Sequence, residues 1–425
     1  MLKLVLPVMP EDRLSLKDTF IFSLQQVMAC FSATVLVPII VGLPTNVALF
    51  SAGVGTLIYL ICTGFKVPQF LGSSFAFIPP LISVSQTFGW GAVSGAIIAS
   101  GLFYAIVSII IGKVGLGWLD KVFPAPVIGA VIVSIGMSLL PGTVTATFGG
   151  GDPLVFLIGI MTVLIIAFVS TKAKGYFKAI PVLIGLIVGY FIQLIIGSFV
   201  PALKIDFSNV ISASWISFPF GPGFGKYQFL PVPIITFLIV SLATITEHIG
   251  DNYTLSSIVG REFYKDPGLH KTILGDGLAS AFAGFTGSVA NTSYGESSAT
   301  QALSKVHSVR IIVGASIIAI LLSFCGKFGA LVATIPAPVL NGACLALYGA
   351  IASSGLRRIV DAGVNFSDSR NLIICSVIMT IGIGGTAFSI GQFSLGGVAL
   401  ATIIGIILNL ILPKDKECKN GCCSF

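Results

Sequence analysis

Residues 287–296 read Gly287-Ser-Val-Ala-Asn-Thr-Ser-Tyr-Gly-Glu296, a polar and glycine-rich stretch inside strongly apolar sequence. A second stretch of this kind, Gly72-Ser-Ser-Phe-Ala-Phe77, lies in the first half of the chain. Downstream of each, the tetrapeptide Pro-Ala-Pro-Val opens an apolar run, at 124–127 and again at 336–339. Two readings are open: an internal repeat, or two similar helix starts, because Pro favours the first turn of a helix. We favour the repeat, since the interruption and the tetrapeptide recur in the same order.

The composition indicates a chain that is surrounded by lipid. Hydrophobic residues make up 55% of the 425 residues and charged residues only 9%, whereas a soluble domain has about 25% charged residues. Apolar runs of about 20 residues cross a bilayer as helices. We therefore predict an all-α polytopic membrane protein with about fourteen transmembrane segments. They are expected at 19–41, 47–64, 67–87, 91–112, 124–140, 154–171, 179–199, 231–256, 271–286, 290–304, 308–327, 335–352, 370–387 and 394–412.

The positive charges are distributed unevenly between the two sides of this map. Of the 23 Lys and Arg residues, only Lys204, Lys226 and Lys327 fall in connections on one side. Positive residues collect in cytoplasmic connections, so we predict a multi-pass protein of the plasma membrane with both termini cytoplasmic. The formal net charge of +7 is spread over short connections and forms no basic face, which argues against a nucleic-acid partner.

The two halves of the map each contain seven segments, and an odd number gives two repeats opposite orientations in the membrane. We predict a cytoplasmic N-terminal segment at 1–18, a first repeat (TM1–7) at 19–199, a second repeat (TM8–14) at 231–412 and a cytoplasmic tail at 413–425. Interrupted helices at corresponding positions of inverted halves indicate the central site of a secondary transporter. The sequence contains no Walker-type phosphate loop, so an ion gradient or passive flow would drive transport.

Four carboxylates, Glu247, Asp251, Asp276 and Glu296, fall inside predicted segments, where a charge costs at least about 2.5 kcal/mol and is a functional candidate by default. Glu247 and Asp251 are four residues apart and share one helix face, so one of them can carry a proton. For Asp251, a solvated position near a helix end is the alternative. Glu296 follows Tyr294-Gly295, where a broken helix would leave backbone N–H groups free.

A carboxylate beside free backbone groups and aromatic rings suits a small, planar, polar ligand. Phe75 and Tyr294 could stack on such a ligand, although core packing is the alternative for Phe75. Asp276 is expected to be structural, and His248 to pack in the interior or make a local hydrogen bond. The three histidines are too scattered for a metal site, and we expect no cofactor. An intramembrane enzyme that uses His248 and Asp251 would need further catalytic groups, so no enzymatic activity is predicted.

Together these stretches resemble the nucleobase–ascorbate transporter family, especially its bacterial uracil permease branch. The resemblance spans nearly the whole chain and is carried by Ser23-Leu-Gln-Gln, Ala33-Thr-Val-Leu-Val-Pro38, Leu71-Gly-Ser-Ser-Phe-Ala-Phe-Ile78, Gly117-Trp-Leu-Asp120, Glu247-His-Ile-Gly250, Asp266-Pro-Gly-Leu-His270, Asn291-Thr-Ser-Tyr-Gly-Glu296 and Leu347-Tyr-Gly349. It implies a seven-plus-seven inverted repeat, with a core domain and a gate domain each assembled from both repeats. It also implies two short β-strands, at about 73–76 and 290–293, that lead into half helices at the substrate site.

The resemblance also assigns roles to residues. Glu247 and Glu296 would bind the base and couple its transport to protons. Asp251 is a further proton-coupling candidate from its spacing to Glu247, not from the resemblance. The pocket would be lined by Phe75, Tyr294, Gly295, Ala33 and Tyr348. We therefore predict a proton symporter that imports a nucleobase, with uracil as the favoured base. Its partners would be the nucleobase and membrane lipid, and a homodimer is the oligomer that this family suggests.

Two positions depart from the uracil permease pattern. Asp251 stands where that pattern has His, which bears on the coupling ion and its pH range. Ser297-Ser-Ala299 stands where the family signature reads Asn-x-Gly, so a xanthine or urate permease of the same family is the first alternative. An anion permease of the same architecture is a further alternative, which carboxylates at Glu247 and Glu296 disfavour.

Overall fold

The computed structural model describes residues 7–115, 117–148, 150–385, 388–390, 393–395 and 397–413. The tail predicted at 413–425 lies outside these residues except for Pro413, and so do the first six residues of the predicted N-terminal segment. The side chains of residues 119, 120, 176, 388–390 and 393–395 are also outside the description.

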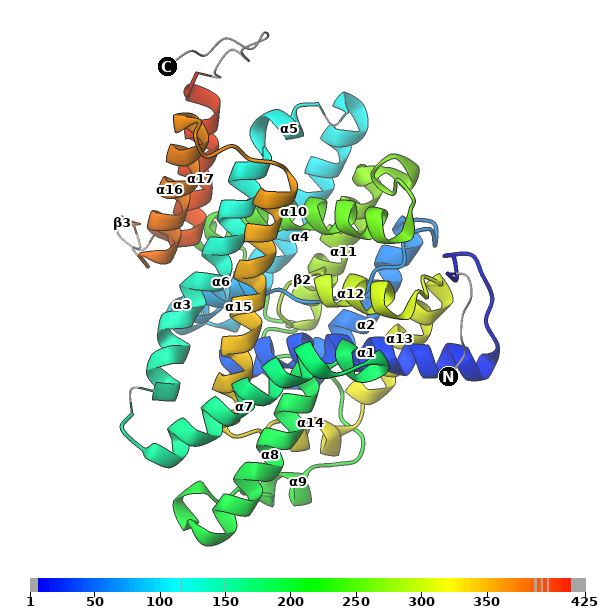
Figure 1. Cartoon of the computed structure of the whole chain (residues 1–425), viewed down its shortest axis with the longest axis vertical. Helices are drawn as coiled ribbons and strands as arrows, with labels where there is room; N and C mark the ends of the chain where they lie inside the picture. The colour runs from blue at the N-terminus through cyan, green and yellow to red at the C-terminus, as the bar shows by residue number, and fades with distance from the viewer. Residues whose placement is uncertain are drawn as a thin grey trace.

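Helices make up most of the structure, and two pairs of short strands interrupt them (Figure 1). In chain order the elements are α1 (Leu16–Val41), α2 (Thr45–Cys62), β1 (Leu71–Ser73), η1 (Phe75–Phe77), α3 (Ile78–Phe88), α4 (Trp90–Val114), α5 (Leu119–Val122), α6 (Ala125–Phe148), α7 (Pro153–Lys172), η2 (Gly175–Ala179), α8 (Pro181–Phe199), η3 (Pro201–Leu203), α9 (Ser208–Ser212), α10 (Pro231–Val259), η4 (Tyr264–Gly268), α11 (Leu269–Thr286), β2 (Asn291–Ser293), α12 (Gly295–Ser304), α13 (Val309–Ser323), α14 (Gly326–Val332), α15 (Ala337–Asp361), α16 (Ser369–Ile383), β3 (Phe388–Ile390), β4 (Phe393–Leu395) and α17 (Gly397–Ile411).

Each segment that hydropathy predicts contains a helix. In the described part of the chain, eight helices are long and apolar enough to cross a membrane: α1, α2, α4, α6, α7, α8, α10 and α15. Shorter apolar helices occur at Phe75–Phe88 and as α13, α16 and α17. Large apolar side chains such as Phe168 on α7 and Phe191 on α8 are exposed, as expected for helices that face lipid. The mostly helical polytopic fold is confirmed, while the number of fourteen spans stays a prediction.

The helices pack in two groups, and each group draws on both halves of the sequence. Helices α1–α4 and α10–α14 pack around β1 and β2, and we call them the first packing group. Helices α6–α8 and α15–α17 form the second packing group. Within it α6 and α15, the two helices that Pro-Ala-Pro-Val opens, run side by side (Figure 1). Glycine permits this approach, because a Cβ on Gly355 would lie only 2.7 Å from the carbonyl oxygen of Gly129.

Two three-residue strands lie buried in the first packing group. β1 and β2 are antiparallel, with Leu71 opposite Ser293, and all their residues are buried. Backbone polar groups away from water need partners within the protein, and each strand supplies them to the other. The strand predicted at 290–293 is confirmed to within one residue. The strand predicted at about 73–76 begins two residues earlier, because Phe75–Phe77 turn as the 3-10 helix η1 that leads into α3.

A second strand pair replaces the ends of two predicted segments. The segments predicted at 370–387 and 394–412 are too long, because α16 ends before Gly385, whose φ of 65° suits glycine, and α17 begins only at residue 397. Between them β3 and β4 pair, with Phe388 opposite Leu395. This hairpin was absent from the sequence-based prediction.

Candidate functional site

Three carboxylates meet where α10 passes β2 and α12. Glu247 and Asp251 lie one turn apart on α10, and Glu296 lies in the first turn of α12. All three residues are partly buried. Each carboxyl group is close enough to the other two for an electrostatic interaction. The structure therefore brings together the three acids that the sequence singles out.

The start of α12 borders open space. Gly295 is exposed, and no atom lies within 4 Å of the position that a Cβ would take there. No side chain caps the first turn of this helix; the N-terminal end of a helix presents backbone N–H groups and a partial positive charge, and here Ser297 N donates to the carbonyl oxygen of Tyr294 at 3.2 Å. Hydrogen-bond donors of the backbone are thus placed next to the Glu296 carboxylate.

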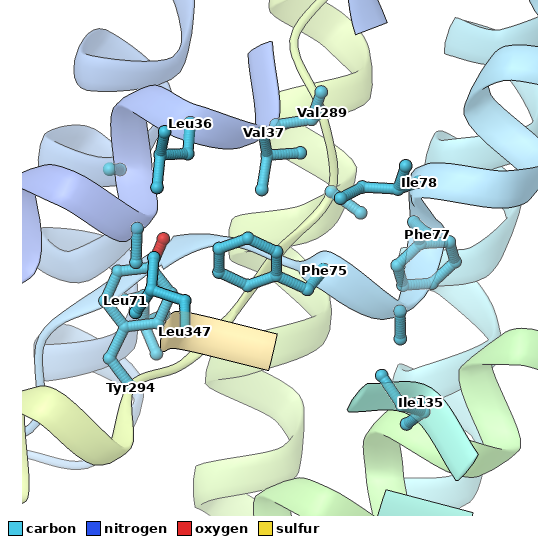
Figure 2. Packing of buried hydrophobic residues seen from close by; sticks show 14 of the residues in the cluster. Leu36, Val37, Leu71, Phe75, Phe77, Ile78, Ile135, Val289, Tyr294 and Leu347 are labelled. Carbon is cyan, nitrogen blue, oxygen red and sulfur yellow. The ribbon is translucent and has the colours of Figure 1, made fainter. Parts of the chain in front are cut away.

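Two aromatic rings join the two packing groups. Phe75 of η1 packs edge-on against Tyr348 of α15, with ring centroids 5.9 Å apart and ring planes at 83°. Phe75 is 8% exposed and Tyr348 is 2% exposed. Figure 2 shows the Phe75 ring with Leu36 and Val37 of α1 on one side and Leu347 of α15 on the other. A movement of one group against the other would separate these rings.

Tyr294 holds the strands in place. A Cβ on Gly72 of β1 would lie 2.5 Å from the Tyr294 ring, so this ring lies directly against the strand. The Tyr294 hydroxyl donates to the carbonyl oxygen of Ser73 at 3.0 Å and accepts from Thr34 Oγ1 of α1 at 3.4 Å. Ala33, next to Thr34, is fully buried. The structure gives Tyr294 a positioning role, and its stacking on a ligand stays a prediction.

A chain of polar contacts runs from Asp251 into the interior. Ser293 Oγ of β2 donates to Asp251 Oδ2 at 3.0 Å and lies 3.2 Å from His248 Nδ1. His248 Nδ1 in turn lies 3.6 Å from Asp276 Oδ2 of α11. His248 does make a hydrogen bond, but its partner Ser293 lies on β2, 45 residues away, and is not local; its contact with the fully buried Asp276 likewise has no signal in the sequence. The described residues contain no group of three or more metal-ligating side chains.

The two serines that depart from the family signature lie in the interior. Ser297 Oγ accepts from Gln26 Nε2 at 2.6 Å, and Ser298 Oγ donates to Gln69 Oε1 at 3.2 Å. These contacts hold the half helix α12 against α1 and against the segment before β1. Sequence reasoning missed Gln26 and Gln69, although an amide within or beside an apolar run is a usable signal, since a buried amide needs partners.

The fold and the site define a membrane transport protein built around broken helices. Apolar helices enclose two paired strands, and carboxylates surround the start of a half helix. The model of the permease family matches residues 17–391. The chain belongs to this family, and it is a multi-pass membrane protein.

Uracil permeases are among its curated relatives. The uracil permease of Bacillus caldolyticus is 41% identical over 415 residues, which cover 96% of this chain and 95% of that protein. The uracil permease of Escherichia coli K12 is 39% identical over 410 residues, covering 94% of this chain and 92% of that protein. The resemblance to the uracil permease branch is thereby confirmed, and proteins of this kind are transporters, not enzymes.

Solved structures share the fold at low sequence identity. The transmembrane domain of the cyanobacterial bicarbonate transporter BicA matches with a TM-score of 0.66 at 16% identity, covering 95% of this chain and all of that one. The murine solute carrier 26 family member A9, an anion transporter in the inward-facing state, matches with a TM-score of 0.68 at 10% identity and covers 94% of this chain and 68% of that one. At these identities the likeness concerns the fold alone.

Proposed function

We propose that the protein imports a nucleobase, with uracil as the favoured base, by proton symport. One observation carries the proposal: Glu247 and Glu296 interact with each other at the open start of α12. The proposal also draws on the relatives named above, which are uracil permeases. Glu247 and Glu296 would bind the base.

The chemistry of the site matches the edge of a pyrimidine base. Uracil presents ring N–H donors and carbonyl acceptors on its edge, and a flat apolar face. The Glu247 carboxylate accepts hydrogen bonds from N–H groups, and the backbone N–H groups at the start of α12 suit carbonyl oxygens. Phe75 and Tyr348, which pack against each other, would offer an aromatic surface for the base. Gly295 leaves open space for the base, and Ala33 and Tyr294 would complete the wall.

The three acids also suggest how a proton is carried. Carboxylates that interact in a region of low dielectric constant cannot all be ionised at once, so at least one of Glu247, Asp251 and Glu296 holds a proton. A base that donates hydrogen bonds to one of them changes which acid holds it. Uptake of base and proton together, followed by release of both inside the cell, would couple import to the proton gradient.

Transport further requires that the site open to each side in turn. We infer that the first packing group is the core domain and the second the gate domain of two inverted repeats, at 19–199 and 231–412. The contact of Phe75 with Tyr348 across their boundary and the packing of α6 on α15 support this division. The charge distribution supports cytoplasmic termini in the plasma membrane, and a homodimer stays a proposal from the family.

Two alternatives bear on the substrate. A xanthine or urate permease is suggested by the departure at Ser297 and Ser298, but these serines bond to Gln26 and Gln69 in the interior, which weakens this alternative. The second alternative is an anion permease, because this chain shares its fold with a bicarbonate transporter. Three carboxylates in the site would repel an anion, which is why we favour a neutral base.

Purified protein in liposomes tests the proposal directly. Radiolabelled uracil, xanthine and sulfate are offered in parallel under an inward proton gradient, with and without a protonophore. We expect uracil to accumulate and the protonophore to abolish the accumulation. Xanthine uptake without uracil uptake would select the first alternative, and sulfate uptake the second. Uptake of none of the three under the gradient would refute the proposed function.

A further inference from the structure

A separate cavity lies between α10 and the second packing group. Its volume is about 320 Å³, near the lower end of the range of about 300–1,000 Å³ for small-molecule pockets. One wall is formed by Ala125 and Ile128 of α6, Phe123 just before α6, and Arg358 of α15. The opposite wall is formed by Ile249 and Tyr253 of α10. None of the residues proposed to bind the base lines this cavity.

Arg358 is the charged residue of the cavity wall. Its guanidinium carbon lies 5.5 Å from the centre of the Tyr253 ring. A Cβ on Gly250 would lie 3.8 Å from the same carbon, so the cation rests against α10 one residue before Asp251. Its Nε is buried and donates no hydrogen bond to any described residue. A buried donor without an acceptor costs free energy, and an acceptor from a ligand in the cavity would offset this cost.

The walls and the single cation define the class of ligand. The rings of Phe123 and Tyr253 and the side chains of Ile128 and Ile249 give an apolar lining, which suits the face of an aromatic heterocycle. The planar guanidinium of Arg358 donates well to carbonyl oxygens. A phosphate ester would bring more negative charge into this apolar lining than one cation balances. The cavity therefore suits a planar, uncharged heterocycle with carbonyl groups on its edge.

The cavity lies farther along the same two helices as the central site. At 1.5 Å per residue, Tyr253 lies about 9 Å beyond Glu247 along α10, and Arg358 about 15 Å beyond Tyr348 along α15. The connection after α10 carries Arg261 and Lys265, and the connection after α15 is flanked by Arg358 in the last turn of α15 and Arg370 in the first turn of α16. These connections are on the side that the charge distribution assigns to the cytoplasm.

We propose that this cavity is a second, weaker binding site for the transported base, on the cytoplasmic side of the central site. The base would stack on Tyr253 and Phe123 and place a carbonyl oxygen on Arg358. This inference rests on the proposed transport of a nucleobase. It adds a station between the core and the gate, at which the base is held after it leaves Glu247.

Equilibrium binding of radiolabelled uracil to the purified full-length protein in nanodiscs tests this site. We expect the wild type to bind uracil at one tight and one weak site, and E247Q to keep only the weak site. In the E247Q background, R358Q should raise the Kd of the weak site about tenfold or more, because a charge-assisted hydrogen bond is lost. A125L should have a similar effect, because its larger side chain fills the cavity. The matched control is R357Q, since Arg357 is exposed and outside the cavity, and it should change neither site.

The outcomes separate the second site from the proposed function. A single tight site in the wild type, with no binding to E247Q, overturns the second site and leaves the central site intact. Weak binding that survives both R358Q and A125L places that binding elsewhere and also overturns the proposal. Wild type that binds no uracil at all contradicts the proposed function instead. If R358Q does not elute as a folded protein, A125L and R358K are used to test the weak site in its place, because both keep a positive charge at residue 358.

Discussion

Ser293 Oγ of β2 donates a hydrogen bond to Asp251 Oδ2 of α10 at 3.0 Å. The bond joins the strand that leads into α12 to the carboxylate that stands where the uracil permease pattern has His. His248 Nδ1 lies 3.2 Å from the same serine hydroxyl. A change of protonation at Asp251 therefore alters the hydrogen bonding of the strand that places Glu296.

Asp251→Asn should separate binding from proton coupling. Asn keeps an oxygen acceptor for Ser293 but carries no exchangeable acidic proton. We expect uracil binding within about threefold of the wild type, because the change in one neutral hydrogen bond is worth about 1 kcal/mol or less. Accumulation driven by a proton gradient should be lost, while exchange of internal for external uracil persists. The measurement compares both modes of flux in the same liposomes.

Ser293→Ala is the matched control for this change, since it removes the hydrogen bond and leaves the carboxyl group. It should reduce the rate of accumulation without abolishing it. Full gradient-driven accumulation by Asp251→Asn would show that the coupling proton is carried by Glu247 or Glu296 alone.

Glu247→Gln should abolish uracil binding at the central site while expression stays intact. The amide replaces one acceptor oxygen by a donor, so hydrogen bonds from ring N–H groups to a carboxylate, worth about 1.5–3 kcal/mol each, are lost. Two such bonds correspond to a rise in Kd of about 100-fold or more. Saturation binding to purified protein measures it. Glu262→Gln serves as control, because Glu262 is exposed and bound to Lys265 outside the site; retained affinity in Glu247→Gln would refute the assigned role.

Sequence reasoning succeeded for the helices because apolar length is a local property. It failed where tertiary contacts or turn residues determine where a helix or strand begins and ends. The segment predicted at 335–352 continues to Asp361, because polar side chains such as Arg358 lower hydropathy without ending a helix. The hairpin between Phe388 and Leu395 was hidden because two short apolar strands have the same hydropathy as a helix end.

In the candidate site, too, local features were predicted from the sequence and contacts between elements were not. Glu247 and Asp251 could be paired from their spacing, because residues four apart share a helix face. The contact of His248 with Asp276, at 3.6 Å, joins two different helices and leaves no trace in spacing. Tyr294 was expected to face a ligand, and only the three-dimensional packing shows its ring against β1.

His307 should make the docking of the N-terminal segment depend on pH. Val8 N donates to the carbonyl oxygen of Lys305 at 2.9 Å, and His307 N donates to that of Val8 at 2.8 Å. The His307 side chain is buried, and burial lowers its pKa below the usual 6.5. Because the folded-state pKa is depressed, the stability that neutral His307 contributes is present above the unfolded pKa of 6.5 and is lost as the pH falls below it.

The expected result is a melting temperature that falls between about pH 7 and pH 5, with a smaller fall in His307→Gln, which cannot be protonated in this range. His270→Gln is the matched control and should keep the slope of the wild type. Thermal unfolding followed by tryptophan fluorescence measures the slopes. Equal slopes for wild type and His307→Gln would show that other groups set the pH dependence.

Gly295→Ala should weaken uracil binding without lowering stability, whereas Gly72→Ala should lower stability. A methyl group on Gly295 meets no atom within 4 Å, and Ala favours a helix more than Gly does, so the melting temperature should not fall. The methyl group enters the space proposed for the base, and the Kd for uracil should rise about tenfold, which is about 1.4 kcal/mol. Gly72→Ala instead places a Cβ 2.5 Å from the buried Tyr294 ring and should destabilise the protein by about 1–3 kcal/mol. Gly142→Ala on α6 also meets no atom within 4 Å, so it should likewise not lower the melting temperature, but it should leave the Kd for uracil unchanged. If a stable Gly295→Ala protein binds uracil with wild-type affinity, the base does not occupy the space at the start of α12, because the added methyl group would fill part of that space.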